Sequence, residues 1–323
     1  MNSHILLKYI LDGQGGGKSL LEKGQASSNI ENSLVWTHLD ANHPDTRTWL
    51  NKEIHHLDPY VVDELLADET RPRFMQVDDG ILLILRGMNL NQDSTPEDMV
   101  SIRLWVDKTR IISVRVRSLR AVDDIAKDIG SNKGPKNSGD FVTMLISRLS
   151  NRMEPVLSNL DDKIVNIEEQ VIDKPDTNLR ESIIEARKQT IVFRRYILPQ
   201  RDAIEQLRIS KVSWLKESHK RYLIEIYNHV VRYIEDLDEF RDRAQVVKDE
   251  LSNALGDRLN KNMYVLSVIA AIFLPLSFLT GLLGINIAGI PGSQNIHAFW
   301  IFSTILVLIV ALQIYIFKKL KWI

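Results

Sequence analysis

The charge-free stretch near the C-terminus constrains the fold of this chain more than any other feature. From Asn262 to Phe317 the sequence contains no Lys, Arg, Asp or Glu. A membrane-spanning helix needs about 20 apolar residues, so the stretch is long enough for two passes and a turn. Residues that break helices mark the turn at Gly284, Gly289, Pro291 and Gly292. We therefore expect a membrane hairpin with a first helix over 264–284, a loop over 285–297 and a second helix over 298–317.

The positions of the cations predict how this hairpin is oriented. Arg258 and Lys261 precede the first helix, and the short tail over 318–323 is rich in lysine. The loop between the two helices carries no cation. Because loops rich in Lys and Arg remain in the cytoplasm, we expect both termini to be cytoplasmic and the loop to face the outside.

Composition assigns most of the chain to a part outside the membrane. Charged residues make up 26% of the 323 residues, and the formal net charge is -1. This balance offers no basic face, so we expect no nucleic-acid partner. The absence of cysteine excludes disulfides, thiolate zinc sites and cysteine nucleophiles. No Ser-His-Asp set or HExxH motif stands out, and we expect no catalytic residues, no enzyme activity and no bound cofactor.

In the part of the chain before the membrane hairpin, the sequence predicts an α/β domain over 1–139 and a helical segment over 140–216. Alternating or β-branched stretches predict strands over Ile5–Leu11, Leu34–Leu39, Arg73–Val77, Ile81–Arg86, Met99–Val106 and Arg110–Val116. Helical spacing and first-turn prolines predict helices over Pro44–Ile54, Pro59–Ala67, Leu119–Ile129, Phe141–Ile172 and Thr177–Ile209. We interpret the paired charges in the last two helices as solvated or helix-to-helix pairs.

A glycine-rich segment over 13–19, GQGGGKS, invites comparison with a phosphate-binding loop. The pattern requires a glycine where Asp12 stands, and no helix is predicted after Ser19. We therefore expect a hairpin turn here and not a nucleotide site.

A single long helix is predicted to join the cytoplasmic part to the membrane. Between Glu217 and Pro275 the sequence has no proline, so a stalk over 217–263 can continue into the first membrane helix, with a total length on the order of 100 Å. At alternating steps of four and three, one face carries mostly small or polar residues: Asp242, Val246, Asp249, Asn253, Gly256, Asn260, Met263, Ser267, Ala270, Leu274, Ser277, Gly281 and Gly284. A dry coiled-coil seam would need Leu, Ile or Val there.

Two interpretations of this face stay open. Small residues allow close packing between membrane helices. Alternatively, several copies around an axis would line a pore with Asn260, Ser267 and Ser277, and Met263 and Leu274 would form apolar constrictions. Asp242 and Asp249 would then form acidic rings that attract cations below the membrane, or they are ordinary solvated charges of the stalk.

The end of the first membrane helix resembles the CorA family of divalent-cation transporters. The stretch Phe273–Asn286, FLPLSFLTGLLGIN, is similar to the end of the family's pore helix, which closes with Gly-Met-Asn. Here Ile285 replaces the methionine, and the uncharged continuation IAGIPG is similar to the ZntB zinc-transporter branch. The stretches WTHLD at 36–40 and DPYVVDELL at 58–66 occur in the expected order, so the resemblance covers the whole chain.

This resemblance implies a CorA-like funnel of five identical chains, in which an α/β domain and long stalk helices lead into the pore. It also implies that the Gly284-Ile285-Asn286 motif is the ion entry, where five Asn286 amide oxygens contact the water shell of a hydrated divalent cation. The expected activity is zinc transport across a bacterial inner membrane, with direction open and uptake preferred. If transport is proton-coupled, His297, Asp242 and Asp249 are the candidate proton sites, and His297 is also a possible metal site.

Other functions remain open on the sequence. A CorA-type channel for magnesium, cobalt or nickel is the alternative within transport, although the loop lacks the acidic residue usual in the magnesium branch. A membrane-anchored coiled-coil scaffold or metal sensor without flux is the alternative of another class. His219 and His229 could bind regulatory zinc, but we expect them to be exposed or packed.

Overall fold

The structure, a computed structural model, describes residues 3–21, 33–55, 59–285, 290, 292 and 295–320. The chain divides into two compact units. The first comprises Met1–Lys174 and Asn178–Lys248, and the second, which we call the C-terminal unit, comprises Pro175–Thr177 and Asp249–Ile323. The predicted domain limits at 139/140 and 216/217 stay predictions.

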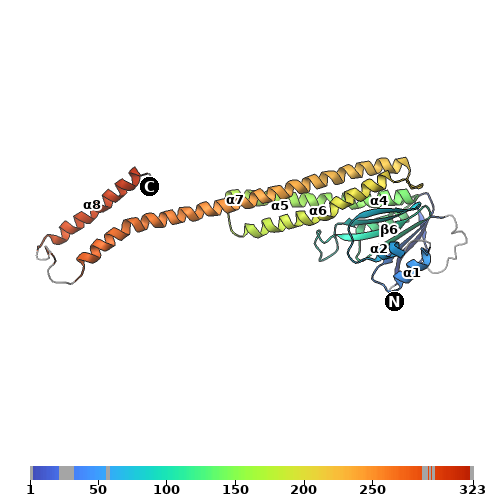
Figure 1. The fold of residues 1–323 in the computed structure, drawn as a ribbon, viewed down its shortest axis with the longest axis horizontal. Helices are drawn as coiled ribbons and strands as arrows, with labels where there is room; N and C mark the ends of the chain where they lie inside the picture. Colours follow the sequence, from blue (N-terminus) through green and yellow to red (C-terminus); the bar gives the residue numbers. More distant parts are fainter. Residues whose placement is uncertain are drawn as a thin grey trace. The chain divides into compact units, whose positions relative to one another are not determined.

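The first unit is built on a seven-stranded sheet with the order β2-β1-β3-β7-β6-β5-β4 (Figure 1). The strands are β1 (Ile5–Leu11), β2 (Gly17–Ser19), β3 (Val35–Asp40), β4 (Arg73–Val77), β5 (Gly80–Gly87), β6 (Val100–Val106) and β7 (Arg110–Arg115). β3 and β7 are parallel, and the other neighbouring strands are antiparallel. All six predicted strands are confirmed to within one residue at each end. The sequence analysis missed β2.

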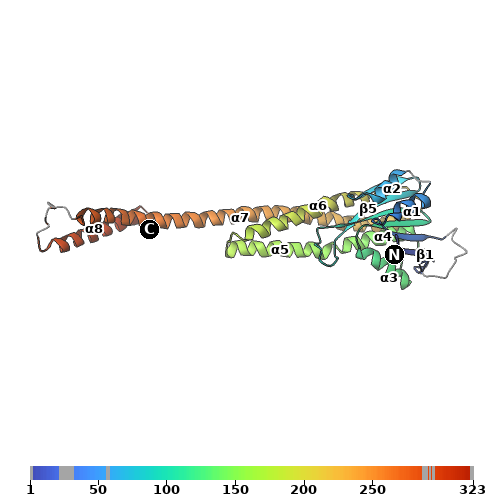
Figure 2. The same cartoon turned by 90° about the horizontal axis from the view of Figure 1, so that it is seen from below.

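Helices cover both faces of this sheet (Figure 2). On one face, α1 (Asp45–Glu53) and α2 (Pro59–Leu66) pack their apolar sides on Leu82, Trp105 and Ile112. Neighbouring positions in a strand point to opposite faces, and Leu83 is as fully buried as Leu82. Leu83 therefore lies on the other face of the sheet. There α4 (Ser138–Asn151) and α6 (Leu179–Ile209) contact β5 and cover it. Burial on both faces explains why β5 reads as a continuous apolar run.

The predicted helix over Phe141–Ile172 is wrong as one element. The chain forms α4 and then α5 (Glu154–Asp173), with a break at Arg152 and Met153. Pro155 explains the break, because proline has no N–H and fits only in the first turn of a helix. The other predicted helices are present as α1, α2, α3 (Arg120–Gly130) and α6.

The glycine-rich segment forms the predicted hairpin between β1 and β2. The Asp12 carboxylate accepts hydrogen bonds from the backbone N–H groups of Gln14 and Gly16 at 2.7 and 2.9 Å. A phosphate-binding loop would leave such amides for the ligand, so the chain's own carboxylate occupies the place of the anion.

The longest element is α7 (Glu217–Leu283), which is a single helix of 67 residues with Pro275 inside it. It begins at the predicted residue and ends one residue before Gly284. Gly284 donates a backbone hydrogen bond to the Thr280 carbonyl at 2.9 Å. The second apolar helix is α8 (Ala298–Lys319), which begins where predicted and ends two residues later.

Candidate functional site

The N-terminal part of α7 buries one face in the first unit and leaves the opposite face exposed. Ala244 and Val247 are buried, whereas the side chains of Asp242 and Val246 are largely exposed. A shift of two residues is about 200° around a helix, so the exposed pair lies nearly opposite the buried pair. The predicted face of the stalk is therefore the one that the unit's own packing leaves free.

Ion pairs hold the packed side of α7 in place. Arg243 pairs with Glu168 and Asp161 of α5, and Asp238 pairs with Arg194 of α6. Glu168 and Arg194 belong to the paired charges that we interpreted as solvated or helix-to-helix pairs, and both form helix-to-helix pairs. These contacts fix the rotation of α7 in this unit and so determine which side chains stay exposed.

In the C-terminal unit α7 again has two distinct faces. The partly covered positions recur at helical spacing: Val268, Ala271, Ile272, Leu276 and Leu279. The Gln313 side chain of α8 donates a hydrogen bond to the Ala271 carbonyl at 3.5 Å, which identifies this side as the one next to α8. The predicted face is exposed at every described position from Asn260 onward: Asn260, Met263, Ser267, Ala270, Leu274, Ser277, Gly281 and Gly284.

The chemistry of this exposed face suits a hydrated cation. The Ser267 hydroxyl donates to the Met263 carbonyl of its own helix at 2.8 Å. With its proton used in this way, the Ser267 oxygen offers only lone pairs outward, and these accept hydrogen bonds from water bound to a metal ion. The side chains of Met263 and Leu274 are 60% and 70% exposed, so the other described residues leave these two apolar positions largely uncovered.

The two predicted acidic residues, Asp242 and Asp249, both have exposed side chains. Asp242 accepts a 2.8 Å hydrogen bond from the guanidinium of Arg241, and this bond raises the pKa of Arg241. The adjacent cation compensates part of the Asp242 charge. Asp249 is exposed in the C-terminal unit.

The predicted entry lies only partly within the described residues. Gly284 and Ile285 are exposed, whereas Asn286 falls outside the part of the chain that the structure describes. His297 is exposed and precedes α8, where its carbonyl accepts a hydrogen bond from Ile301 N–H at 3.1 Å. The His297 N–H donates to the Asn295 side chain at 3.0 Å.

His219 and His229 do not form a regulatory zinc site. His219 is buried, with Nε2 at 2.8 Å from Asp140 and Nδ1 accepting a hydrogen bond from Lys216 N–H. Both ring nitrogens are therefore in use. His229 is exposed ten residues further along α7, beside Arg232. His219 is a packed histidine, as expected.

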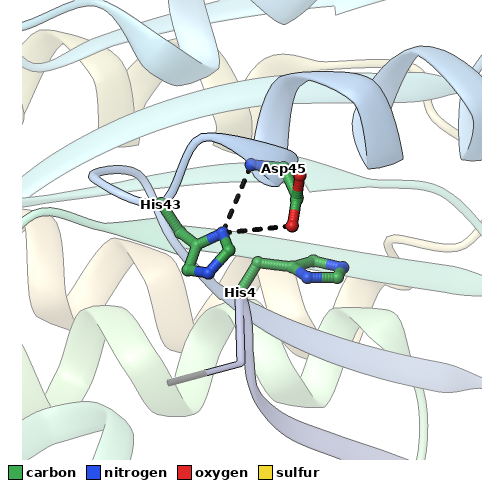
Figure 3. Close-up of side chains that lie close together, drawn as sticks. All are labelled: His4, His43 and Asp45. Carbon is green, nitrogen blue, oxygen red and sulfur yellow. Dashed lines mark hydrogen bonds and ion pairs between the residues drawn. The ribbon is translucent and has the colours of Figure 1, made fainter. Parts of the chain in front are cut away.

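The structure brings together three residues that could ligate a metal ion and that the sequence analysis missed: His4, His43 and Asp45. Their ligand atoms all lie within 4.8 Å of one another (Figure 3). The His-x-Asp spacing at 43 and 45, directly after a strand, is the signal in the sequence that could have found them. His4 joins them only through the pairing of β1 with β3.

Comparison with known proteins identifies the family of this chain. Residues 31–319 match the family described as CorA-like Mg2+ transporter protein. The chain belongs to the CorA family. One relative, the divalent cation transporter CmaX of Pseudomonas aeruginosa, is 36% identical over 98% of this chain and 96% of its own length. The zinc transport protein ZntB of Yersinia enterocolitica is 35% identical over 99% of this chain and 96% of its own length.

Solved structures agree with this assignment to the CorA family. The full-length CmaX structure matches with a TM-score of 0.85 and 35% identity, covering 100% of this chain and 99% of that one. The ZntB cytoplasmic domain from Vibrio parahaemolyticus matches with a TM-score of 0.69 and 28% identity, covering 79% of this chain and 100% of that one. The CorA magnesium transporter of Methanocaldococcus jannaschii has a TM-score of 0.81 and 18% identity over the whole of both chains, which shows the CorA fold.

The CorA resemblance, its ZntB branch and the CorA-like fold class are thereby confirmed. These relatives are named as transporters, not as enzymes. The chain also has the two helices expected of a membrane protein, because α7 and α8 are each long and apolar enough to cross a membrane. It is a member of a divalent-cation transporter family.

Proposed function

We propose that this chain transports zinc ions across a bacterial inner membrane, through a pore lined by the exposed face of α7. One observation carries the proposal. From Asn260 to Gly281 this face carries small or polar side chains at every position except Met263 and Leu274, and it stays exposed, while the adjacent side of α7 is partly covered. A helix that served only as an anchor would not need small or polar side chains along one face. The relatives named as zinc transport proteins support zinc as the cargo.

The exposed face needs copies of itself to enclose water. We propose a homopentamer, as the family resemblance implies, with N- and C-termini in the cytoplasm. Asn260, Ser267 and Ser277 would supply oxygen atoms along the pore, and Met263 and Leu274 would form constrictions from which water can withdraw. Ala270 and Gly281 would leave room between these levels.

Zinc would pass through this pore with its water shell largely intact. Tight zinc sites use Cys or His ligands, sometimes with a carboxylate. The stretch 262–317 contains no Cys, Asp or Glu, and His297 is its single histidine. Weak contacts through the water shell also favour rapid release. Asn286 would make such contacts at the outer mouth, where its amide oxygen accepts hydrogen bonds from water on the ion.

We further propose that transport is uptake and is coupled to protons. His297 and the acids Asp242 and Asp249 are the candidate coupling sites, because few other groups along the path titrate. His297→Ala should then change the pH dependence of zinc flux. An unchanged pH dependence would exclude His297 and leave the stalk acids.

Metal uptake into proteoliposomes tests the proposed function. Wild type, Asn286→Ala and the loop control Asn295→Ala are compared with zinc and with magnesium under an imposed pH gradient. We expect zinc entry that responds to the gradient, that is lost in Asn286→Ala and that persists in Asn295→Ala. Equal magnesium entry without a pH effect would favour the second candidate, a broader divalent-cation channel. The family description naming Mg2+ and the relative named as a divalent cation transporter favour that candidate. No flux of any ion would favour the scaffold or sensor.

A further inference from the structure

We propose that His4, His43 and Asp45 form a binding site for a zinc-class divalent cation in the α/β part of the first unit. The site is separate from α7 and from the residues proposed to line the pore. The inference does not rest on the proposed transport function, because it predicts metal binding whether or not ions cross the membrane.

The fold brings the three residues together from separate places in the sequence. Ile5 pairs with Leu39, and the Asp40 N–H donates to the His4 carbonyl at 3.0 Å, so His4 lies beside the end of β3. The chain then turns through His43, and Asp45 is the first residue of α1. Figure 3 shows the three side chains side by side.

Hydrogen bonds hold the turn that presents two of these ligands. The Thr46 hydroxyl donates to the Asp40 carbonyl at 2.6 Å, and the Ala41 N–H donates to the Arg115 carbonyl at 2.8 Å on β7. The backbone of the site is thus tied both to α1 and to the sheet. A tied backbone lowers the entropy lost when side chains close on an ion.

Both histidine rings have a nitrogen atom that a metal ion could bind. His4 Nε2 is buried and has no hydrogen-bond partner among the described residues. A buried polar atom without a hydrogen bond destabilises the folded chain. His43 Nδ1 accepts a 3.2 Å hydrogen bond from the Asp45 N–H, so a lone pair points toward Asp45. The Asp45 carboxylate oxygen lies 3.7 Å from the same nitrogen.

These distances are close to those of a tetrahedral zinc site. Bonds of about 2.0–2.1 Å place neighbouring ligand atoms about 3.4 Å apart. His43 Nδ1 and the Asp45 oxygen need only a small approach from 3.7 Å, and the whole group lies within 4.8 Å. Metal binding would replace the Asp45 N–H bond to His43, which is a long one.

The ligand set determines which ions would bind. Two imidazoles and one carboxylate suit zinc, with water in the fourth position, and also suit cobalt or nickel. Magnesium prefers six oxygen ligands and would bind poorly. Asp45 is exposed and both histidines are only partly buried, so the ion can exchange with solvent. These are the properties of a site that responds to metal concentration in solution.

Calorimetric titration of the purified full-length protein in detergent with zinc tests this site. The variants are His43→Ala and Asp45→Asn, the second of which keeps the shape of the side chain. His55→Ala is the matched control, because His55 is an exposed histidine at the other end of α1. Subtracting the control isolates this site from zinc held elsewhere on the chain.

We expect wild type and His55→Ala to bind the same number of zinc ions per chain. His43→Ala should lose one of them, and Asp45→Asn should bind that ion at least about tenfold more weakly, since even changes behind the ligands cost 10–100-fold. Magnesium at the same concentration should not compete. Cobalt bound to wild type should give the visible spectrum of a tetrahedral site, and His4→Ala should remove it. Wild-type zinc stoichiometry and affinity in both His43→Ala and Asp45→Asn would overturn the proposal.

Discussion

Arg243 of α7 forms a two-point ion pair with Glu168 of α5, with nitrogen–oxygen distances of 2.6 and 3.1 Å. The same guanidinium donates to Asp161 at 2.8 Å. Bidentate pairs of this kind fix orientation as well as distance. They hold the packed face of α7 against α5, and the opposite face of α7 stays exposed in this unit.

Replacing Arg243 should loosen this attachment. We expect Arg243→Gln to lower the free energy of unfolding by about 1–2 kcal/mol, because two partly buried carboxylates lose their charged partner. Thermal unfolding followed by circular dichroism measures the change. Arg241→Gln is the control, since Arg241 pairs with Asp242 and Asp238 of its own helix. Equal losses in the two variants would mean that the contact between helices adds nothing.

His38 makes the stability of the first unit depend on pH. Burial lowers the pKa of His38 to about 3, with a further contribution from the charge of Arg115. An unfolded chain has a histidine pKa of about 6.5, so between these values the unfolded state binds the extra proton. The contribution of neutral His38 to the free energy of unfolding is fully present above about pH 6.5. It is lost as the pH falls from there toward 3, by up to about 1.4 kcal/mol per pH unit.

The variant His38→Gln should remove this contribution. Denaturant unfolding between about pH 7.5 and pH 4.5 should give a shallower acid slope for the variant than for wild type, since most carboxylates are still ionised there. His55→Ala, in which an exposed histidine is removed, should keep the wild-type slope. Identical slopes for wild type and His38→Gln would show that the pKa of His38 is the same in the folded and unfolded states.

Gly139 provides space for the His219 ring. A Cβ atom added at Gly139 would overlap this ring, whose Nε2 lies 2.8 Å from the neighbouring Asp140. We expect Gly139→Ala to destabilise the protein by about 1–3 kcal/mol, as overpacking does in a dense core.

A second glycine serves as the control for this prediction. At Gly130 an added Cβ would meet no described atom within 4 Å, so Gly130→Ala should be neutral or stabilise by up to about 1 kcal/mol. The two melting temperatures, measured side by side, check the prediction. Similar values for both variants would contradict the role given to Gly139.

The sequence predicted the sheet and the long helix well because local signals determine them. Stretches of alternating apolar and polar residues, ended by turns, mark the six predicted strands. No proline interrupts α7 before Pro275. The break between α4 and α5 was missed because the buried apolar residues continue across it at helical steps, at Leu149, Met153 and Leu157. Pro155 was the signal that should have taken precedence.

Features that depend on pairing between distant strands could not be predicted in this way. β2 is a Gly-Lys-Ser segment with no strand preference of its own, and it is extended because β1 provides its partner. His4 reaches His43 and Asp45 only because β1 pairs with β3 in the observed register. By contrast, the residues that share one face of α7 follow from helical spacing alone, and their role as a pore lining stays a prediction.

Chemical modification of single cysteines in the first membrane helix tests most directly whether this face of α7 lines the ion path. The natural chain has no cysteine, so a thiol reagent reacts only at the position introduced. Ser277→Cys places a thiol on the exposed face, and Leu279→Cys places one about 200° around the helix on the partly covered side. We predict that a water-soluble cationic thiol reagent stops zinc uptake into proteoliposomes in Ser277→Cys and leaves Leu279→Cys active. Loss of uptake in Leu279→Cys, with uptake in Ser277→Cys unaffected, would show that this face of α7 does not line the ion path.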